Sequence, residues 1–217
     1  MADVTVIYYT SNRERQPFEA RIIRTLVEHA AGLPIVSVSQ FPINLGTNIC
    51  VGDVGASSHN LYRQMQMGAR AAQTPLVCTA ESDYLYPREY FAHRCADRET
   101  FDFVRRTYMI YDHEYYYSRR INEAAMVVGR DYLVQAIDDM LNGSGTTDMW
   151  HPEGQLPCLF LNKRRRTARI ATPILTFKTP QNLHQKHHKR SYLKQFEVET
   201  LPFWGTAREL TERYCAA

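Results

Sequence analysis

The chain has 217 residues, of which 44% are hydrophobic and 23% are charged, and these proportions exclude a disordered tail, a collagen and a bare coiled coil. The length predicts a single domain over 1–217, and no run approaches the ~18 to 20 apolar residues that span a bilayer. The net charge of +3 is unevenly distributed, because segment 151–194 carries +9 and the remaining residues −6. Such a basic segment can bind a polyanion or a diphosphate.

The first half of the chain alternates apolar runs, typical of buried strands, with amphipathic stretches of helical period. The expected elements are strands Val4–Thr10, Ile35–Ser39 and Leu76–Ala80 and helices Pro17–Ala30 and Ser57–Ala72. The Gly- and Asn-rich stretch 42–55 is expected to be a loop, with Ser57 or Ser58 capping the helix that follows. This alternation predicts an α/β fold with a mostly parallel central sheet flanked by helices.

The second half is less regular, and it ends in a basic region and a short helix. The expected elements are strands Thr107–Tyr111, Ala124–Val128 and Pro173–Thr179 and helices Asp131–Leu141 and Thr206–Tyr214. The beginning of the chain is interpreted as the first strand rather than as a signal peptide. Five scattered cysteines without a C-x-x-C pair favour neither a disulfide framework nor a zinc site, so the cytoplasm is the expected location.

The most informative motif is LVCTAESDYLYP, residues 76–87. A buried strand here delivers Glu81 and Asp83 to a turn, and this i, i+2 spacing allows both carboxylates to hold a hard divalent cation. A solvated acidic turn is the alternative for an isolated E-x-D sequence. Ligands of open parallel sheets bind beyond the carboxyl ends of the strands, where Ser11 and Gln40 are also expected.

The run A-E-S-D-Y-L-Y-P-x-E-Y-F resembles the metal-binding segment of GT-A fold glycosyltransferases, especially family 2-like members. The preceding helix and the opening strand resemble the corresponding elements of that family. The resemblance covers roughly residues 3–91 well and the remainder loosely. It implies a GT-A-like fold with a nucleotide-sugar-binding half over 1–91 and an acceptor half over 92–217.

The resemblance also implies roles for individual residues. Asp83 would be the principal metal ligand for Mn2+ or Mg2+, with Glu81 on the metal or the ribose, and His184 would complete the metal site. Further residues, near the nucleotide or its phosphates, would be Thr10, Ser11, Gln40 and Arg63. His187 and His188 compete with His184 for the metal, and a surface position in a basic loop is the alternative for His184. For Arg63 the alternative is an outward-facing helix residue.

The catalytic base is less clearly marked. Inverting members of the family use a carboxylate, often in a Glu-Asp pair, and no such pair lies between 142 and 163. Asp148 and Glu153 are the two candidates there. A retaining mechanism and an inactive domain both stay open.

The basic run His184–Arg190 is a candidate clamp for the departing diphosphate, or both it and the run Lys163–Arg169 hold a polyanionic acceptor. A solvated surface is the alternative. Tyr115–Tyr117 with the following Arg119 and Arg120 could stack sugars or bases, although tyrosine runs also occur at sheet edges.

The sequence therefore predicts a metal-dependent glycosyltransferase that uses a nucleotide-diphosphate sugar, with a UDP-sugar as the expected donor. Its acceptor hydroxyl would belong to a glycan or lipid-linked glycan, or to a hydroxylated DNA base of the kind found in viral DNA modification. A non-catalytic nucleic-acid-binding protein on a GT-A-like fold is the alternative from another class. A nucleotidyltransferase is disfavoured because TSNRERQPF lacks the expected glycines.

Overall fold

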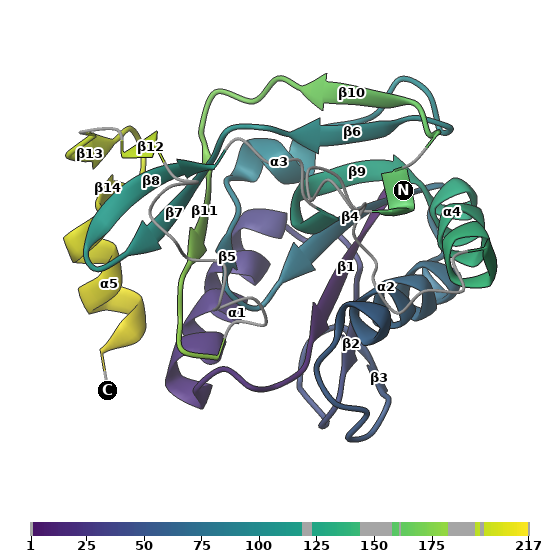
Figure 1. Ribbon diagram of the computed structural model, residues 1–217, viewed down its shortest axis with the longest axis horizontal. Coiled ribbons are helices and arrows are strands. Elements are labelled where there is room, and N and C mark those ends of the chain that lie inside the picture. The colour runs from purple at the N-terminus through teal and green to yellow at the C-terminus, as the bar shows by residue number, and fades with distance from the viewer. Residues whose placement is uncertain are drawn as a thin grey trace.

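The computed structural model describes residues 2–118, 123–143, 158–160, 162–181, 194–195 and 198–216. Its largest sheet has seven strands in the order β10-β6-β9-β4-β1-β2-β3 (Figure 1). The strands are β1 Val4–Thr10, β2 Ile35–Ser39, β3 Thr47–Cys50, β4 Leu76–Glu81, β6 Phe101–Val104, β9 Met126–Gly129 and β10 Arg165–Ala168. Pairs β1–β2, β1–β4, β2–β3 and β10–β6 are parallel, whereas β9 is antiparallel to both neighbours. The mostly parallel sheet expected from the sequence is confirmed.

A second sheet of five strands has the order β12-β8-β7-β11-β5. Its strands are β5 Tyr84–Leu85, β7 Thr107–Tyr111, β8 Glu114–Ser118, β11 Ile174–Phe177 and β12 Lys194–Gln195, and a separate pair is formed by β13 Thr200–Leu201 and β14 Gly205–Thr206. Strand β5 follows β4 almost directly in the chain. The second sheet therefore begins beside the acidic turn.

Helices cover both faces of the large sheet. The helices are α1 Gln16–Ala30, α2 Ser58–Ala71, α3 Arg88–Ala92, α4 Arg130–Gly143 and α5 Ala207–Cys215, with 3-10 turns η1 Glu123–Ala125 and η2 Cys158–Phe160. Figure 1 shows α2 and α4 side by side on one face, while side chains of α1 and α3 join the core of the opposite face. Helix α2 approaches β1 closely, since a Cβ atom on Gly68 would lie 2.5 Å from Ile7 Cγ2.

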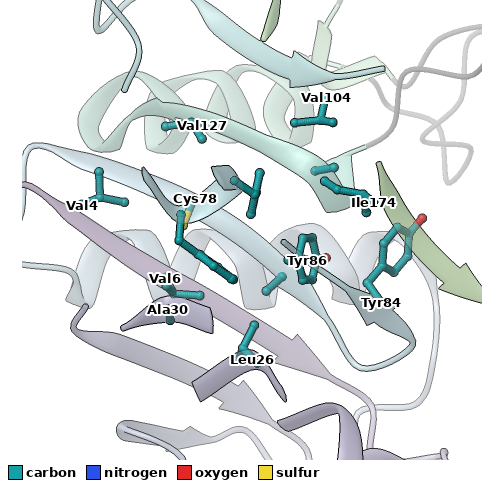
Figure 2. Close-up of a cluster of buried hydrophobic side chains, with 14 of the residues drawn as sticks. Val4, Val6, Leu26, Ala30, Cys78, Tyr84, Tyr86, Val104, Val127 and Ile174 are labelled. Carbon is teal, nitrogen blue, oxygen red and sulfur yellow. The ribbon is translucent and has the colours of Figure 1, made fainter. Parts of the chain in front are cut away.

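The core on the α1 face is continuous from the first strand to the second sheet. Figure 2 shows Val6 of β1, Cys78 of β4 and Leu26 of α1 in one cluster with Tyr86 and Ile174. Burial of this apolar surface fixes the strands in register. The carboxyl ends of β1, β2 and β4 consequently lie together at one edge.

Two expected elements differ from the structure. The expected loop 42–55 contains β3, which pairs with β2 in parallel from Val36–Thr47 onward. As an edge strand, β3 has only half-buried or exposed residues and hence no apolar run to reveal it. The expected strand Ala124–Val128 begins instead as the 3-10 turn η1 and becomes extended only from Met126.

Candidate functional site

Three strand ends predicted to meet do so at one edge of the large sheet. In the parallel register, Thr10 is paired with Ser39, and Tyr9 is paired with Glu81. Helix α2 begins beyond this edge, and Ser57 caps it by accepting a hydrogen bond from Asn60 N at 3.1 Å. The edge thus combines polar strand ends with a helix N-terminus, an arrangement that suits anionic ligands.

Glu81 is held at the end of β4 by tyrosines. Tyr9 OH donates to Glu81 Oε1 at 2.8 Å, and Glu81 N donates to Tyr86 OH at 3.0 Å. Tyr86 OH in turn donates to Ala124 O at 2.7 Å, which connects β4 to η1. The carboxylate is therefore oriented by fixed neighbours.

Asp83 lies in the turn between β4 and β5, and the residue is only 8% exposed. Thr176 Oγ1 donates to Asp83 Oδ2 at 3.2 Å, and Phe177 N donates to Asp83 O at 2.8 Å. Both partners belong to β11, so the second sheet fixes the acidic turn. Few aspartates are this buried without a specific role or partner.

Negative charge accumulates around Glu81. Burial raises the pKa of Glu81 well above its ordinary value, and the nearby carboxylates of Asp83 and Glu123 raise it further. Glu123 is itself buried, and burial raises its pKa as well. A divalent cation beside Glu81 and Asp83 would relieve this repulsion, so the donor set fits a hard metal ion with oxygen ligands.

The predicted nucleotide-binding residues differ in how far they are buried. Thr10 is buried and its Oγ1 accepts from Asn12 N at 2.9 Å, while Ser11 is partly exposed at the same strand end. Gln40 is buried and donates through Nε2 to Gly55 O at 2.8 Å, so it ties the β2 end to the loop before α2. Arg63 is exposed on α2. Their roles toward a nucleotide stay predictions.

The predicted third metal ligand and both predicted bases lie outside the described residues. These are His184, Asp148 and Glu153. Within the described ranges, no group of three or more His, Cys, Asp or Glu side chains is arranged to hold a metal ion. Completion of the site by His184 and base catalysis by Asp148 or Glu153 therefore stay predictions.

Sequence reasoning missed Glu14, which the fold brings toward the acidic turn. Thr179 Oγ1, just beyond β11, donates to Glu14 Oε1 at 2.7 Å. Burial raises the pKa of Glu14 from 4.5 to about 7; the hydrogen bond from Thr179 opposes the rise and the Asp83 carboxylate adds to it. Local spacing gives no signal for this contact, because 165 residues separate its two partners.

Replacement of Glu14 by Gln is expected to change the pH dependence of stability. A raised pKa means that the folded protein retains the proton, so wild-type stability falls as the pH rises from 4.5 to about 7. Above that range the Gln variant should be more stable by about 2 kcal/mol, a value reduced for partial screening. Urea unfolding of wild type and Glu14→Gln from pH 4 to 8, at equal protein concentration, measures the difference in free energy of unfolding at each pH. Parallel stability curves for the two proteins would show the expectation to be wrong.

The basic run Lys163–Arg169 is largely neutralised by acids of the same chain. Lys163 Nζ lies 2.7 Å from Asp139 Oδ2, and Arg164 pairs with Asp97. Arg166 donates twice to the fully buried Asp102, at 3.0 Å and 2.6 Å. His93 Nε2 lies 2.8 Å from the same carboxylate. Three of the run's cations are therefore paired with acids, and Arg166 ties β10 to β6, which reduces the support for a polyanion track here.

Truncation of Arg166 to Ala is expected to lower the free energy of unfolding by about 3 kcal/mol, because it leaves the buried Asp102 without its bidentate partner. Arg165 on the same strand is exposed and provides a matched control, with an expected loss below about 0.5 kcal/mol. Chemical denaturation of the two variants measures the difference. Equal losses would mean that the Arg166–Asp102 pair does not stabilise β10.

The tyrosine run Tyr115–Tyr117 is not an open stacking surface. Tyr115 and Tyr116 are 2% and 4% exposed, and Tyr117 is partly buried in β8. Tyr115 packs in the core between the second sheet and α5, with its OH donating to Gly205 O at 2.9 Å. The interpretation as a ligand-stacking surface is therefore wrong for the first two tyrosines, because both are buried. Arg119 and Arg120 lie outside the described residues.

The chain matches no family model and no curated protein sequence. It is similar to solved structures of the glycosyltransferase GlyE from Streptococcus pneumoniae TIGR4. One has 12% identity and a TM-score of 0.56, with 98% of this chain and 60% of that chain covered. The apo form has 12% identity and a TM-score of 0.55, with 100% and 61% covered. A mannosyltransferase from Pyrobaculum calidifontis, solved with GDP-Man and Mn2+, is more distant, with 14% identity, a TM-score of 0.49, and 81% and 56% covered.

The chain has the GT-A-like α/β fold of glycosyltransferases, as its sheet order and its similarity to GlyE show. It spans about three-fifths of the length of the GlyE structures that it matches. In the part of the chain that the structure describes, no helix is both long and apolar enough to cross a membrane.

Proposed function

We propose that the protein is a metal-dependent glycosyltransferase that takes a sugar from a nucleotide-diphosphate sugar. The observation that carries this proposal is the position of Glu81 and Asp83 on a GT-A-like fold. Both carboxylates lie at the end of β4, beside the polar ends of β1 and β2. A UDP-sugar is the proposed donor, with the nucleoside beside Thr10, Ser11 and Gln40.

Glu81 and Asp83 would hold Mn2+ or Mg2+, with His184 as a proposed further ligand. When bound, the cation would supply positive charge to the leaving diphosphate. Asp83 is positioned by Thr176 and Glu81 by Tyr9, so neither carboxylate has to reorganise when the charge develops. Arg63 and the run His184–Arg190 are proposed contacts for the phosphates.

In the transfer itself, the bond between the sugar C1 and the diphosphate oxygen breaks and an acceptor oxygen forms the new bond to C1. The acceptor hydroxyl loses its proton, and the released nucleotide diphosphate carries away the bonding electron pair. Asp148 and Glu153 are the proposed proton acceptors for an inverting reaction. A retaining reaction needs no such base and is the alternative.

The proposed acceptor is a hydroxyl group of a glycan or a lipid-linked glycan. A hydroxylated base in DNA is the alternative acceptor, but Lys163, Arg164 and Arg166 are engaged by acids, which weakens a DNA track along β10. The same pairing weakens the proposal of a non-catalytic nucleic-acid-binding protein. The described cysteines Cys50, Cys78, Cys95 and Cys215 are free, which suits a reducing compartment such as the cytoplasm.

Release of nucleotide diphosphate from a panel of UDP-, GDP-, dTDP- and CDP-sugars, with and without Mn2+, tests this proposal. We expect Mn2+-dependent release from one nucleotide class, accelerated by an acceptor glycan. No release from any donor by folded protein would contradict the proposed activity. Metal-independent release at an equal rate would contradict the role of Glu81 and Asp83.

A further inference from the structure

A second site lies where the two sheets meet, on residues that the proposed donor site does not use. It is an open pocket of about 380 Å³, a volume that accommodates a small ligand such as one sugar unit with a phosphate group. Its lining comes from the β6–β7 connection, from β7 and β8, and from the end of β10. The lining residues are Arg105, Arg106, Tyr108, Tyr117, Thr167 and Ala168.

The two arginines give the pocket its charge. Arg105 and Arg106 are both exposed, and among the described residues neither has an acidic partner. Arg106 Nη1 donates to Ala171 O at 2.8 Å, which fixes its guanidinium beside the pocket. This differs from the basic run Lys163–Arg169, where Arg164 and Arg166 are paired with aspartates. Exposed guanidinium groups without acidic partners bind phosphate oxygens through paired N–H donors.

The tyrosines give the pocket an aromatic wall. Tyr108 and Tyr117 are directly paired across β7 and β8, and their ring centroids are 5.3 Å apart. Tyr108 is 8% exposed, so its ring is held rigidly by the surrounding core. A rigid aromatic wall beside cations suits a ring that carries a negative substituent.

The pocket and the acidic turn lie at different places along β11. Ile174 N donates to Arg106 O at 2.9 Å, whereas the Arg106 guanidinium lies at Ala171 O, on the side of Ile174 away from Thr176, which bonds Asp83. Ala171 and Thr176 are five residues apart, which corresponds to about 17 Å of extended chain at most. A ligand anchored at Arg105 and Arg106 would therefore be several sugar units from the proposed reaction site.

We propose that this pocket binds a phosphorylated sugar unit of the acceptor glycan. The guanidinium groups of Arg105 and Arg106 bind the phosphate, and Tyr108 and Tyr117 pack against the sugar ring. The role of this sugar unit as part of the acceptor rests on the proposed glycosyl transfer, whereas binding of a sugar phosphate in the pocket does not. A nucleic acid is less well suited, because an extended strand needs a continuous track of free cations and three cations of the adjacent run are already paired.

Titration calorimetry with glucose 6-phosphate, glucose and inorganic phosphate tests the proposal on the full chain. Wild-type protein should bind glucose 6-phosphate more tightly than either glucose or phosphate alone. Arg105→Gln should weaken this binding about tenfold, since it removes one charge-assisted contact. Arg24→Gln, which replaces an exposed arginine on α1, should leave the affinity unchanged. Unfolding curves for both variants provide the check on folding.

The proposal is overturned if Arg105→Gln and Arg24→Gln bind glucose 6-phosphate as wild type does, or if unphosphorylated glucose binds equally well. It is also overturned if a thymidine oligonucleotide displaces glucose 6-phosphate and binds more tightly than any phosphorylated sugar. Asp83→Asn separates the two proposals, since it should keep sugar-phosphate binding. Loss of nucleotide binding in Asp83→Asn with intact sugar-phosphate binding is the result that both proposals predict, whereas folded wild type that binds sugar phosphate but no nucleotide would contradict only the donor site.

Discussion

Replacement of Asp83 by Asn is expected to lower kcat/KM for sugar transfer by about a thousandfold, because it removes the charge that we propose as the principal metal ligand. The change is nearly isosteric, and the amide can still accept the hydrogen bond that Thr176 donates to Asp83. The acidic turn should therefore stay folded while its charge is lost. Steady-state kinetics at saturating Mn2+ measure the effect.

Asp112→Asn provides the matched control for that variant. Asp112 is exposed in the β7–β8 turn and has a φ of 51°, a conformation that Asn also tolerates. We expect kinetics indistinguishable from wild type. An Asp83→Asn protein that retains more than about a tenth of wild-type kcat/KM would contradict the assignment of Asp83 as the principal ligand.

Replacement of Glu81 by Gln is expected to reduce the apparent affinity for Mn2+ by about a hundredfold. Glu81 is the proposed second carboxylate ligand, and the substitution also removes a carboxyl group whose pKa is raised by burial and by repulsion from Asp83 and Glu123. The variant should consequently be as stable as wild type or more stable, while its metal binding is weaker. Titration of Mn2+ monitored by transfer rate measures the affinity, and thermal unfolding without metal measures stability.

Tyr9→Phe is a milder variant that tests the same carboxylate. It removes the hydrogen bond to Glu81 Oε1 without removing the charge, so a loss of about tenfold in Mn2+ affinity is expected. Glu212→Gln on α5, an exposed position, should change nothing. If Glu81→Gln and Glu212→Gln bind Mn2+ equally, Glu81 is not a ligand and its role would be limited to the ribose or to structure.

The strands that form the candidate site could be predicted because they are buried on both faces. Strands β1, β2 and β4 are mostly apolar and almost wholly buried, with polar ends, and such runs are visible in one sequence. Since parallel strands align their carboxyl ends, the grouping of Thr10, Gln40 and Glu81 followed from the order of elements. The spacing of Glu81 and Asp83 then indicated which end carries the charge.

Elements without such a pattern were missed. Strand β3 lies at the sheet edge and buries little, so its sequence TNIC resembles a loop. Strand β6 carries the fully buried Asp102 between two phenylalanines, and the charge interrupts the apolar run. Asp102 is accommodated there because His93, nine residues earlier, and Arg166, 64 residues later, both contact its carboxylate, and no local pattern reports such partners.

Long-range contacts also determine what the charged residues do. Glu14 and Glu123 approach the acidic turn only through the fold, and Thr179, just beyond β11, donates a hydrogen bond to Glu14. The basic run near 163 suggested a ligand surface, whereas its cations are largely paired with Asp97, Asp102 and Asp139. Composition revealed the excess of positive charge but not which cations remain available.

The most direct test of the donor site is isothermal titration of UDP, GDP, dTDP and CDP with wild type and Asp83→Ala, each with and without Mn2+. The proposed site predicts that one nucleotide, expected to be UDP, binds wild type only when Mn2+ is present and does not bind the variant. Binding that is equal in the two proteins, or the absence of any binding to folded wild type, would contradict a metal-dependent nucleotide-sugar site at Glu81 and Asp83.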